Sequence, residues 1–256
     1  MSTPSIADVR AVGQPDSVMG RANAEHWAGR LYMRRWSPYL TRALIPTGLA
    51  PDAVTWLMLA SGVAAAGALT VPGLTGPIAA VLLVQLQLLL DCSDGELARW
   101  RHHCSPLGVY LDRIGHYCTE AALPVALGVR ADGGWQSIDG WTAVGLVVAV
   151  LVLVVKSETD LVHVARAYAG RPLLRDVAAP PQSRRLGTLR RLARLVPFYR
   201  AYVGVEFTLL ALVAAVFDTA AAGLAGSRLL VVALVAALAA TAVGHLLSIV
   251  SSSRLR

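Results

Sequence analysis

Charged residues are scarce in this chain of 256 residues: they make up 15% of it, while 55% is hydrophobic. Soluble domains carry about a quarter charged residues, so an ordinary water-soluble domain is excluded. A disordered chain and a nucleic-acid-binding domain with a solvated surface are excluded on the same grounds. Lysine is almost absent, because Lys156 is the only one, and arginine supplies the remaining basic charge behind a net +7. Such a surplus in an apolar chain indicates membrane orientation and anionic headgroups.

Cysteine is also rare. The three cysteines, Cys92, Cys104 and Cys118, are odd in number and lack CxxC spacing, which argues against a disulfide framework or a zinc site. We expect them to be small, mostly apolar fillers. The N-terminal region has no short apolar stretch followed by a cleavage site, so a removed signal peptide is not expected.

Long apolar stretches are abundant instead. A bilayer span needs about 20 mostly apolar residues, and six stretches qualify. They are Val54–Pro72, Pro77–Arg99, Pro106–Val129, Trp141–Val164, Ala201–Gly223 and Leu229–Val250. The prediction is an all-α integral membrane protein with six transmembrane helices in residues 51–253, preceded by an N-terminal segment, residues 1–50.

The arginines are distributed unevenly between the connections. They concentrate before the first span, between spans two and three, in the loop 166–200 and after the sixth span, whereas the connections near residues 73–76, 130–140 and 224–228 carry few. The positive-inside rule therefore places both termini and the loop 166–200 in the cytoplasm. We see no internal repeat. The expected location is the inner or plasma membrane of the cell.

Two segments outside the spans have their own character. Residues 24–45 mix Trp and Tyr with Arg, which predicts an amphipathic interfacial helix interrupted near Pro38. Residues 171–199 combine Pro and Arg, which predicts a cytoplasmic loop with a short basic helix at 184–195. The alternative for both is a basic face that is simply solvated or bound to headgroups.

Acids inside apolar spans are costly and usually functional. The second span ends with Asp91 and Asp94, and the third begins with Asp112, His116 and Glu120. Helical periodicity places each set on one face, and a short turn near 102–105 brings the two sets to similar depth. Clustered carboxylates suit one or two hard divalent cations, Mg²⁺, Mn²⁺ or Ca²⁺, which in turn suit a phosphorylated substrate. The alternatives are an intramembrane proton or ion path, or acids paired with arginines.

Read as one string, the chain contains Asp91-x2-Asp94-Gly95-x2-Ala98-Arg99-x8-Gly108-x3-Asp112-x3-His116. This string closely resembles the signature of the CDP-alcohol phosphotransferase family, D-x2-D-G-x2-A-R-x8-G-x3-D-x3-D, and departs from it only at the last position. The segment from Pro51 to Thr55 resembles the family's entry to its first span, with Asp52 where Asn is usual.

The resemblance implies a membrane transferase that moves a phosphoalcohol group from a CDP-alcohol donor to an acceptor hydroxyl and releases CMP. It implies metal ligation by Asp91, Asp94, Asp112 and the residue at position 116, and a homodimer in phospholipid or polar-headgroup synthesis. The residues that it places around the CDP nucleotide are Thr55, Asp94, Gly95, Ala98, Arg99 and Gly108.

His116 stands where the family has its proposed general base. An imidazole can act as a base near neutral pH or ligate Mn²⁺, so Asp112 and His116 are the expected catalytic residues. Glu120, one turn further on, could orient the ring of His116. The alternatives are another base, a histidine filling a polar pocket, or a weak relative that binds nucleotide without turnover.

Basic residues near the fourth and fifth spans are candidates for binding the acceptor. By position these are Lys156, Arg166 and Arg200. A Lys156–Asp160 pair and the topology of the two arginines explain them equally well without a ligand. His245 is expected to be structural. A transporter or ion-binding membrane protein is the competing functional class, although acids clustered on one hairpin disfavour it.

Overall fold

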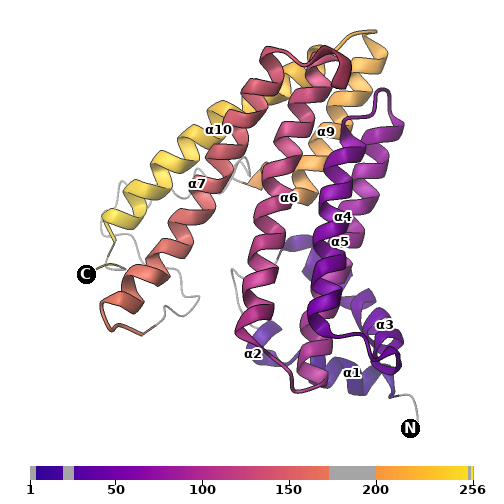
Figure 1. Cartoon of the computed structure of the whole chain (residues 1–256), viewed down its shortest axis with the longest axis vertical. Coiled ribbons are helices and arrows are strands. Elements are labelled where there is room, and N and C mark those ends of the chain that lie inside the picture. Colours follow the sequence, from indigo (N-terminus) through magenta and orange to yellow (C-terminus); the bar gives the residue numbers. More distant parts are fainter. Residues whose placement is uncertain (1–3, 20–25, 173–199, 253–254, 256) are drawn as a thin grey trace. The chain divides into compact units, whose positions relative to one another are not determined.

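The computed structural model describes residues 4–19, 26–172, 200–252 and 255, and every regular element in these ranges is helical (Figure 1). Three short helical turns, η1, η2 and η3, span Gly29–Met33, Ile45–Thr47 and Trp135–Ser137. The α-helices are α1 (Ile6–Gly13), α2 (Asp16–Met19), α3 (Arg34–Leu44), α4 (Pro51–Leu69), α5 (Thr75–Trp100), α6 (Pro106–Asp132), α7 (Gly140–Tyr168), α9 (Gly204–Ala220) and α10 (Ala225–Val250). The all-α prediction is confirmed for these residues.

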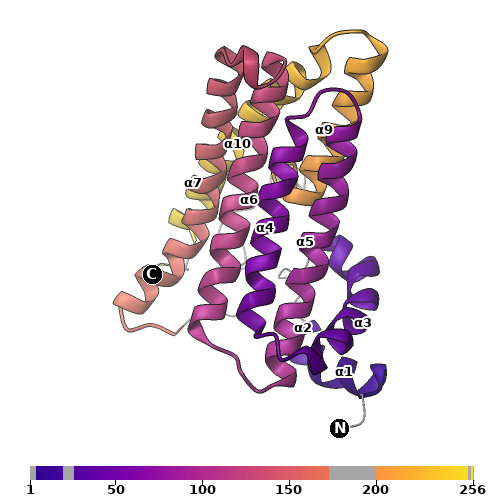
Figure 2. The same ribbon diagram turned by 45° about the vertical axis from the view of Figure 1, so that its right-hand side comes forward.

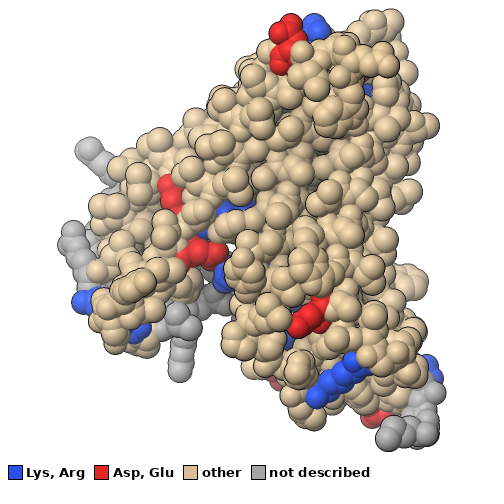
Figure 3. Space-filling model, viewed as in Figure 1, with Lys and Arg blue, Asp and Glu red and all other residues tan. Residues whose placement is uncertain are grey.

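Within the described residues, four helices, α4, α5, α7 and α10, are long and apolar enough to cross a membrane, which indicates an integral membrane protein. By length and composition they match four of the six predicted spans. The other two predicted spans correspond to α6, which carries several charged side chains, and to α9, which has 17 residues. The count of six therefore stays a prediction. Figure 3 shows a face formed mostly by uncharged residues, with charged side chains at a few places.

The chain divides into two compact units. Unit 1 comprises residues 1–65 and 82–119, and unit 2 comprises residues 66–81 and 120–256. Helices α4, α5 and α6 each contribute residues to both.

Unit 1 is built on α4, α5 and the first half of α6. Val54 and Met58 of α4 pack against Leu90 and Leu97 of α5, and all four side chains are buried. At Gly62 of α4, a Cβ atom would overlap the side chain of Thr119 in α6. Small residues allow such close approach of helices in membranes, where dispersion contacts favour association.

The N-terminal helices belong to unit 1 as well. A capping box between Ser5 and Asp8 starts α1, because each side chain satisfies a free backbone N–H of the first turn. The predicted interruption at Pro38 is wrong, since α3 continues through it, preceded by the π-helical turn η1. Proline leaves the carbonyl four residues earlier unbonded, and here the Gln14 side-chain amide donates to that carbonyl, on Arg34, at 2.8 Å.

Helix α3 is amphipathic, as predicted, with an unusual distribution of side chains. Ser37 and Thr41 are fully buried, whereas Trp36 and Tyr39 are 64% and 56% exposed. Exposed aromatic residues with neighbouring arginines suit a membrane interface. Residues 24–25 of the predicted segment and the predicted helix at 184–195 lie outside the described residues.

In unit 2, charged side chains close the short connections between helices. Arg130 donates to the carbonyls of Val71 and Gly73, both at 2.9 Å. Asp132 accepts from the backbone N–H of Thr142 at 2.8 Å, and Asp218 accepts from that of Gly226 at 2.6 Å. These bonds satisfy backbone groups that helix ends leave free. Helices α7 and α10 lie side by side (Figure 2).

None of the three cysteines forms a disulfide in the described structure. Cys92 is buried, as expected of a small filler. The same expectation is wrong for Cys104 and Cys118, which are exposed. Cys104 lies in the turn after α5, and Cys118 lies on an outer face of α6.

Candidate functional site

The hairpin of α5 and α6 brings the predicted acids together within unit 1. Helix α5 ends at Trp100, and the turn that follows contains His102 with a left-handed φ of 51°. Pro106 then begins α6, and the Gly108 N–H donates to the Ser105 hydroxyl at 3.0 Å, which caps the new helix. The turn reverses the chain, so the end of α5 and the start of α6 are antiparallel.

Asp91, Asp112 and His116 form the centre of the site. One ligand atom from each lies within 4.8 Å of the others. The His116 Nε2 atom is 3.1 Å from Asp91 Oδ1 and 3.5 Å from Asp112 Oδ1. Ligands at about 2.1 Å from a Mg²⁺ or Mn²⁺ ion are separated by up to about 4 Å, so these three side chains fit a divalent cation after small adjustments. The side chains are 25%, 43% and 33% exposed in that order, which leaves the cluster accessible.

Asp94 lies next to this cluster without belonging to it in the described structure. Its carboxylate accepts a hydrogen bond from the Thr55 hydroxyl of α4 at 2.7 Å, and both residues are almost fully buried. The sequence predicted that Thr55 contacts the nucleotide. The structure shows Thr55 fixing the orientation of Asp94, a predicted metal ligand and nucleotide contact, while the contact of Thr55 with the nucleotide stays a prediction.

Gly95, Ala98 and Arg99 lie after Asp94 on α5, in the helix that the sequence predicted. A Cβ atom on Gly95 would lie 3.2 Å from Arg99 Nη1, so the guanidinium extends along the helix over the space that this glycine leaves open. The Arg99 Nε atom donates to the Gly13 carbonyl at 2.7 Å. A Cβ atom on Gly108 would lie 3.3 Å from Asp52 Oδ1, so the start of α4 approaches the start of α6 closely.

The predicted acceptor residues lie in unit 2. The Lys156 ammonium is 2.9 Å from Glu120 Oε2, a partner that the sequence did not indicate. Arg166 donates from Nε to the Pro172 carbonyl at 3.0 Å, near the end of α7, and Arg200 is partly buried shortly before α9. The ion pair gives Glu120 a defined role beside Lys156, while its predicted role in orienting His116 stays a prediction.

His245 is structural, as expected. Its Nδ1 atom lies 2.9 Å from Glu158 Oε2, which joins α10 to α7.

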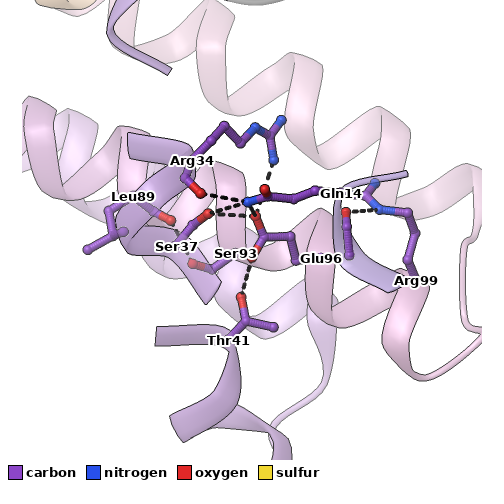
Figure 4. Close-up of polar contacts among 9 residues, drawn as sticks. Gln14, Arg34, Ser37, Thr41, Leu89, Ser93, Glu96 and Arg99 are labelled. Atoms are coloured by element: carbon purple, nitrogen blue, oxygen red, sulfur yellow. Dashed lines mark hydrogen bonds and ion pairs between the residues drawn. The ribbon is translucent and has the colours of Figure 1, made fainter. Parts of the chain in front are cut away.

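Sequence reasoning missed Glu96, which lies inside the motif between Gly95 and Arg99. Its side chain is fully buried and accepts hydrogen bonds from Ser37, Thr41 and Gln14, with Arg34 close by (Figure 4). An acid in a predicted span was the available signal, because such acids are usually functional. Glu96 occupies an unspecified position of the motif, so the motif alone assigns it no role.

A model of the family described as CDP-alcohol phosphatidyltransferase matches residues 48–252. Archaetidylinositol phosphate synthase from Aeropyrum pernix is 46% identical over 72 residues, which are 27% of this chain and 37% of that relative. The solved structure of Mycobacterium tuberculosis phosphatidylinositol phosphate synthase with CDP-DAG bound aligns with a TM-score of 0.53 at 22% identity. That alignment covers 86% of this chain and 96% of the other, and shows a shared fold.

Proposed function

Because this chain belongs to the CDP-alcohol phosphatidyltransferase family, we propose that it transfers a phosphoalcohol group from a CDP-alcohol to an acceptor hydroxyl and releases CMP. The observation that carries the proposal is the cluster of Asp91, Asp112 and His116, because it places two carboxylates and an imidazole within 4.8 Å of one another. In the reaction, the acceptor oxygen bonds to the β-phosphorus of the donor, and the bond from that phosphorus to the bridging oxygen breaks. CMP leaves with that oxygen, and the acceptor loses its proton.

Asp91, Asp112 and His116 are the proposed holders of a divalent metal, with Asp94 as a further ligand. Mg²⁺ or Mn²⁺ bound there supplies positive charge that stabilises the diphosphate as its negative charge shifts towards CMP. Thr55 keeps the Asp94 carboxylate in one orientation through its 2.7 Å hydrogen bond. A ligand that is already oriented loses less conformational entropy when it binds.

His116 is proposed as a ligand through Nε2, because that atom faces the oxygens of both Asp91 and Asp112. Nitrogen in the donor set favours Mn²⁺ over Mg²⁺. Asp112 is the most exposed of the three side chains at 43%. We therefore assign Asp112 to receive the proton of the acceptor hydroxyl.

Gly95, Ala98, Arg99 and Gly108 are proposed to surround the cytidine diphosphate part of the donor. The absence of a side chain at Gly95 leaves space beside the guanidinium of Arg99. A guanidinium can donate two parallel hydrogen bonds to a phosphate.

We propose a lipid CDP-alcohol such as CDP-diacylglycerol as donor and a phosphorylated polar alcohol as acceptor. The names of the archaeal relative and of the mycobacterial synthase, which has CDP-DAG bound, support this choice. Lys156, Arg166 and Arg200 are candidates for the acceptor phosphate, and Lys156 would exchange its contact with Glu120 for it. A cytoplasmic site and a homodimer complete the proposal.

The test uses the purified chain in nanodiscs with CDP-diacylglycerol and a set of acceptors: inositol phosphate, glycerol phosphate, inositol and serine. CMP release and the lipid product, identified by mass spectrometry, are measured with Mg²⁺, with Mn²⁺ and with EDTA. Metal-dependent CMP release with one acceptor supports the proposal. A chain that releases no CMP with any of them would refute it.

His116 favours one alternative, a relative that binds nucleotide with little turnover, because it replaces an acidic position of the motif. In that case the wild-type protein would bind CMP but would form little CMP from any CDP-alcohol donor. His116→Asp would then raise turnover. Under the main proposal, His116→Asp changes the metal preference towards Mg²⁺ while turnover stays within about tenfold.

A further inference from the structure

The N-terminal helices contact the motif through Glu96, which has no exposed surface. Its Oε1 atom accepts from the Ser37 hydroxyl at 2.5 Å and from Gln14 Nε2 at 2.8 Å, and its Oε2 atom accepts from the Thr41 hydroxyl at 2.8 Å (Figure 4). The Arg34 guanidinium adds a longer contact of 3.4 Å. A buried carboxylate with this many donors is rigid, because losing any one of them leaves polar atoms unsatisfied.

Gln14 is the residue through which this network reaches α1. Its side-chain amide donates both to Glu96 Oε1 and to the Arg34 carbonyl, at 2.8 Å in each case. That carbonyl is free because Pro38 cannot donate to it. The proline in α3 and the acid in α5 together create a fitted site for a single side chain of the N-terminal segment.

Gly13, the neighbour of Gln14, packs directly on Glu96. A Cβ atom on Gly13 would lie 3.1 Å from the Cβ atom of Glu96, tighter than ordinary contact. The Gly13 carbonyl then accepts the Arg99 Nε–H at 2.7 Å. Arg99 is thereby held at Nε, which leaves its two terminal nitrogens beside Gly95 for other partners.

We infer that Glu96 and Gln14 are positioning residues, which fix the Gly13 carbonyl and thereby aim the guanidinium of Arg99 at the donor diphosphate. This inference rests on the proposed function of the motif. It makes residues 6–14 part of the donor site, although they precede the region, 48–252, that matches the family model. The expected effect is on donor binding, since Arg99 contacts the substrate equally before and during the reaction.

The experiment measures KM and kcat for CDP-diacylglycerol, together with the Kd of CMP, in Gln14→Ala, Glu96→Gln and Arg99→Ala. Each positioning variant should raise KM and Kd about tenfold and leave kcat within about twofold, the pattern expected when uniform binding is lost. Neither should raise KM further in the Arg99→Ala background, because residues that act through one group are not additive.

Tyr32→Phe is the matched control. Its hydroxyl donates to Gln85 Oε1 at 2.6 Å, so this side chain also joins the N-terminal segment to α5, at a residue other than Glu96. It should leave KM and Kd unchanged. Purely structural roles for Glu96 and Gln14 would lower thermal stability and kcat without the selective change in KM.

The outcomes separate this inference from the proposed function. An active wild type whose KM and Kd are unaffected by Gln14→Ala and Glu96→Gln overturns the inference alone, and so do effects that add fully to those of Arg99→Ala. A wild type that neither releases CMP from any CDP-alcohol nor binds CMP overturns both. Because Gln14→Ala removes only a partly buried side chain, it keeps the test open if Glu96→Gln does not fold.

Discussion

Helix α5 carries two kinds of acid within a few residues of each other. Glu96 is surrounded by donors from the N-terminal helices, which complete its hydrogen bonding. Asp91 instead faces His116, within 4.8 Å of Asp112, another acid. Protein donors stabilise the first carboxylate, whereas two neighbouring carboxylates repel each other unless a cation joins them. The surroundings of an acid, more than its burial, therefore separate the proposed positioning role from the proposed metal binding.

The largest expected effect concerns Asp91 and Asp112. Asp91→Asn or Asp112→Asn should lower CMP release by about 1,000-fold or more, because removing a ligand charge weakens the metal that stabilises the leaving diphosphate. Mn²⁺ binding, measured by electron paramagnetic resonance, should weaken in parallel. Asp139→Asn makes the same change at an exposed acid before α7 and should have no effect. Near-normal activity in either site variant would remove the distinction between the two kinds of acid.

Stability should show the opposite order. Glu96→Ala should lower the free energy of unfolding by about 3 kcal/mol, because the buried donors around it lose their acceptor. Asp112→Asn, measured without divalent metal, should keep or raise Tm because it relieves repulsion with Asp91. Thermal unfolding in detergent, followed by intrinsic fluorescence, compares the two. Equal losses of Tm in Glu96→Ala and Asp112→Asn would contradict the distinction between the two kinds of acid.

His116→Ala should lower kcat by about 100-fold. The role of the ring is read separately, from the nitrogen hyperfine coupling of bound Mn²⁺ in pulsed electron paramagnetic resonance. A histidine coupling in the wild type that disappears in the variant identifies His116 as a ligand. A wild-type spectrum without that coupling, combined with the same loss of kcat, would assign it the role of base.

Thr55 offers a smaller change at the same site. Thr55→Val removes the hydrogen bond to Asp94 while keeping the shape of the side chain, and should lower kcat/KM about tenfold, equivalent to about 1.4 kcal/mol. Thr55→Ser keeps the hydroxyl and should restore most of the activity. If Val and Ser behave alike, the orientation of Asp94 does not depend on this bond.

The smallest effect is expected at Asp132, an acid of unit 2 beyond the predicted third span. Slight burial would raise its pKa, but hydrogen bonds from Thr142, Asp139 and Trp141 outweigh this and lower it. Asp132→Ala removes the acceptor of these hydrogen bonds at the start of α7. It should cost about 1 kcal/mol of stability at neutral pH, the usual cost of losing a helix N-cap, and leave CMP release unchanged. Because the folded-state pKa is lowered, the wild-type advantage is complete above about pH 4 to 5 and is lost as pH falls through that pKa. A variant that equals wild type at neutral pH would exclude this capping role.

Sequence periodicity predicted the helices, and it predicted that the side chains of the α5–α6 hairpin meet. Asp91, Asp112 and His116 meet because residues four apart share a helical face, and because the turn at 101–105 is short enough to make the helices antiparallel. Contacts between different segments were beyond such reasoning. The bond from Thr55 to Asp94, the pair of Lys156 and Glu120, and the donors of Glu96 depend on how each helix is rotated towards its neighbour. Periodicity specifies the face of a helix, while packing decides which partner that face meets.

Pro38 illustrates the same limit for a local rule. Proline predicted a break in α3, yet the helix continues because a side chain from elsewhere in the chain satisfies the unbonded carbonyl. The cost of proline in a helix comes partly from that lost hydrogen bond and partly from the clash of its ring with the same carbonyl. A substitute donor removes part of the cost and turns the defect into a binding position for Gln14.

The position of Glu96 in the chain has a consequence for biosynthesis. An ionised acid entering a bilayer within an apolar segment is costly until it finds partners. Its donors, Gln14, Arg34, Ser37 and Thr41, all precede it, so the ribosome has released every one of them before α5 is complete. Segments that emerge first can fold first. The N-terminal helices can therefore fold at the membrane surface before α5 is synthesised and hydrogen-bond Glu96 as soon as it enters the bilayer. The order of synthesis then favours insertion of the helix that carries the motif.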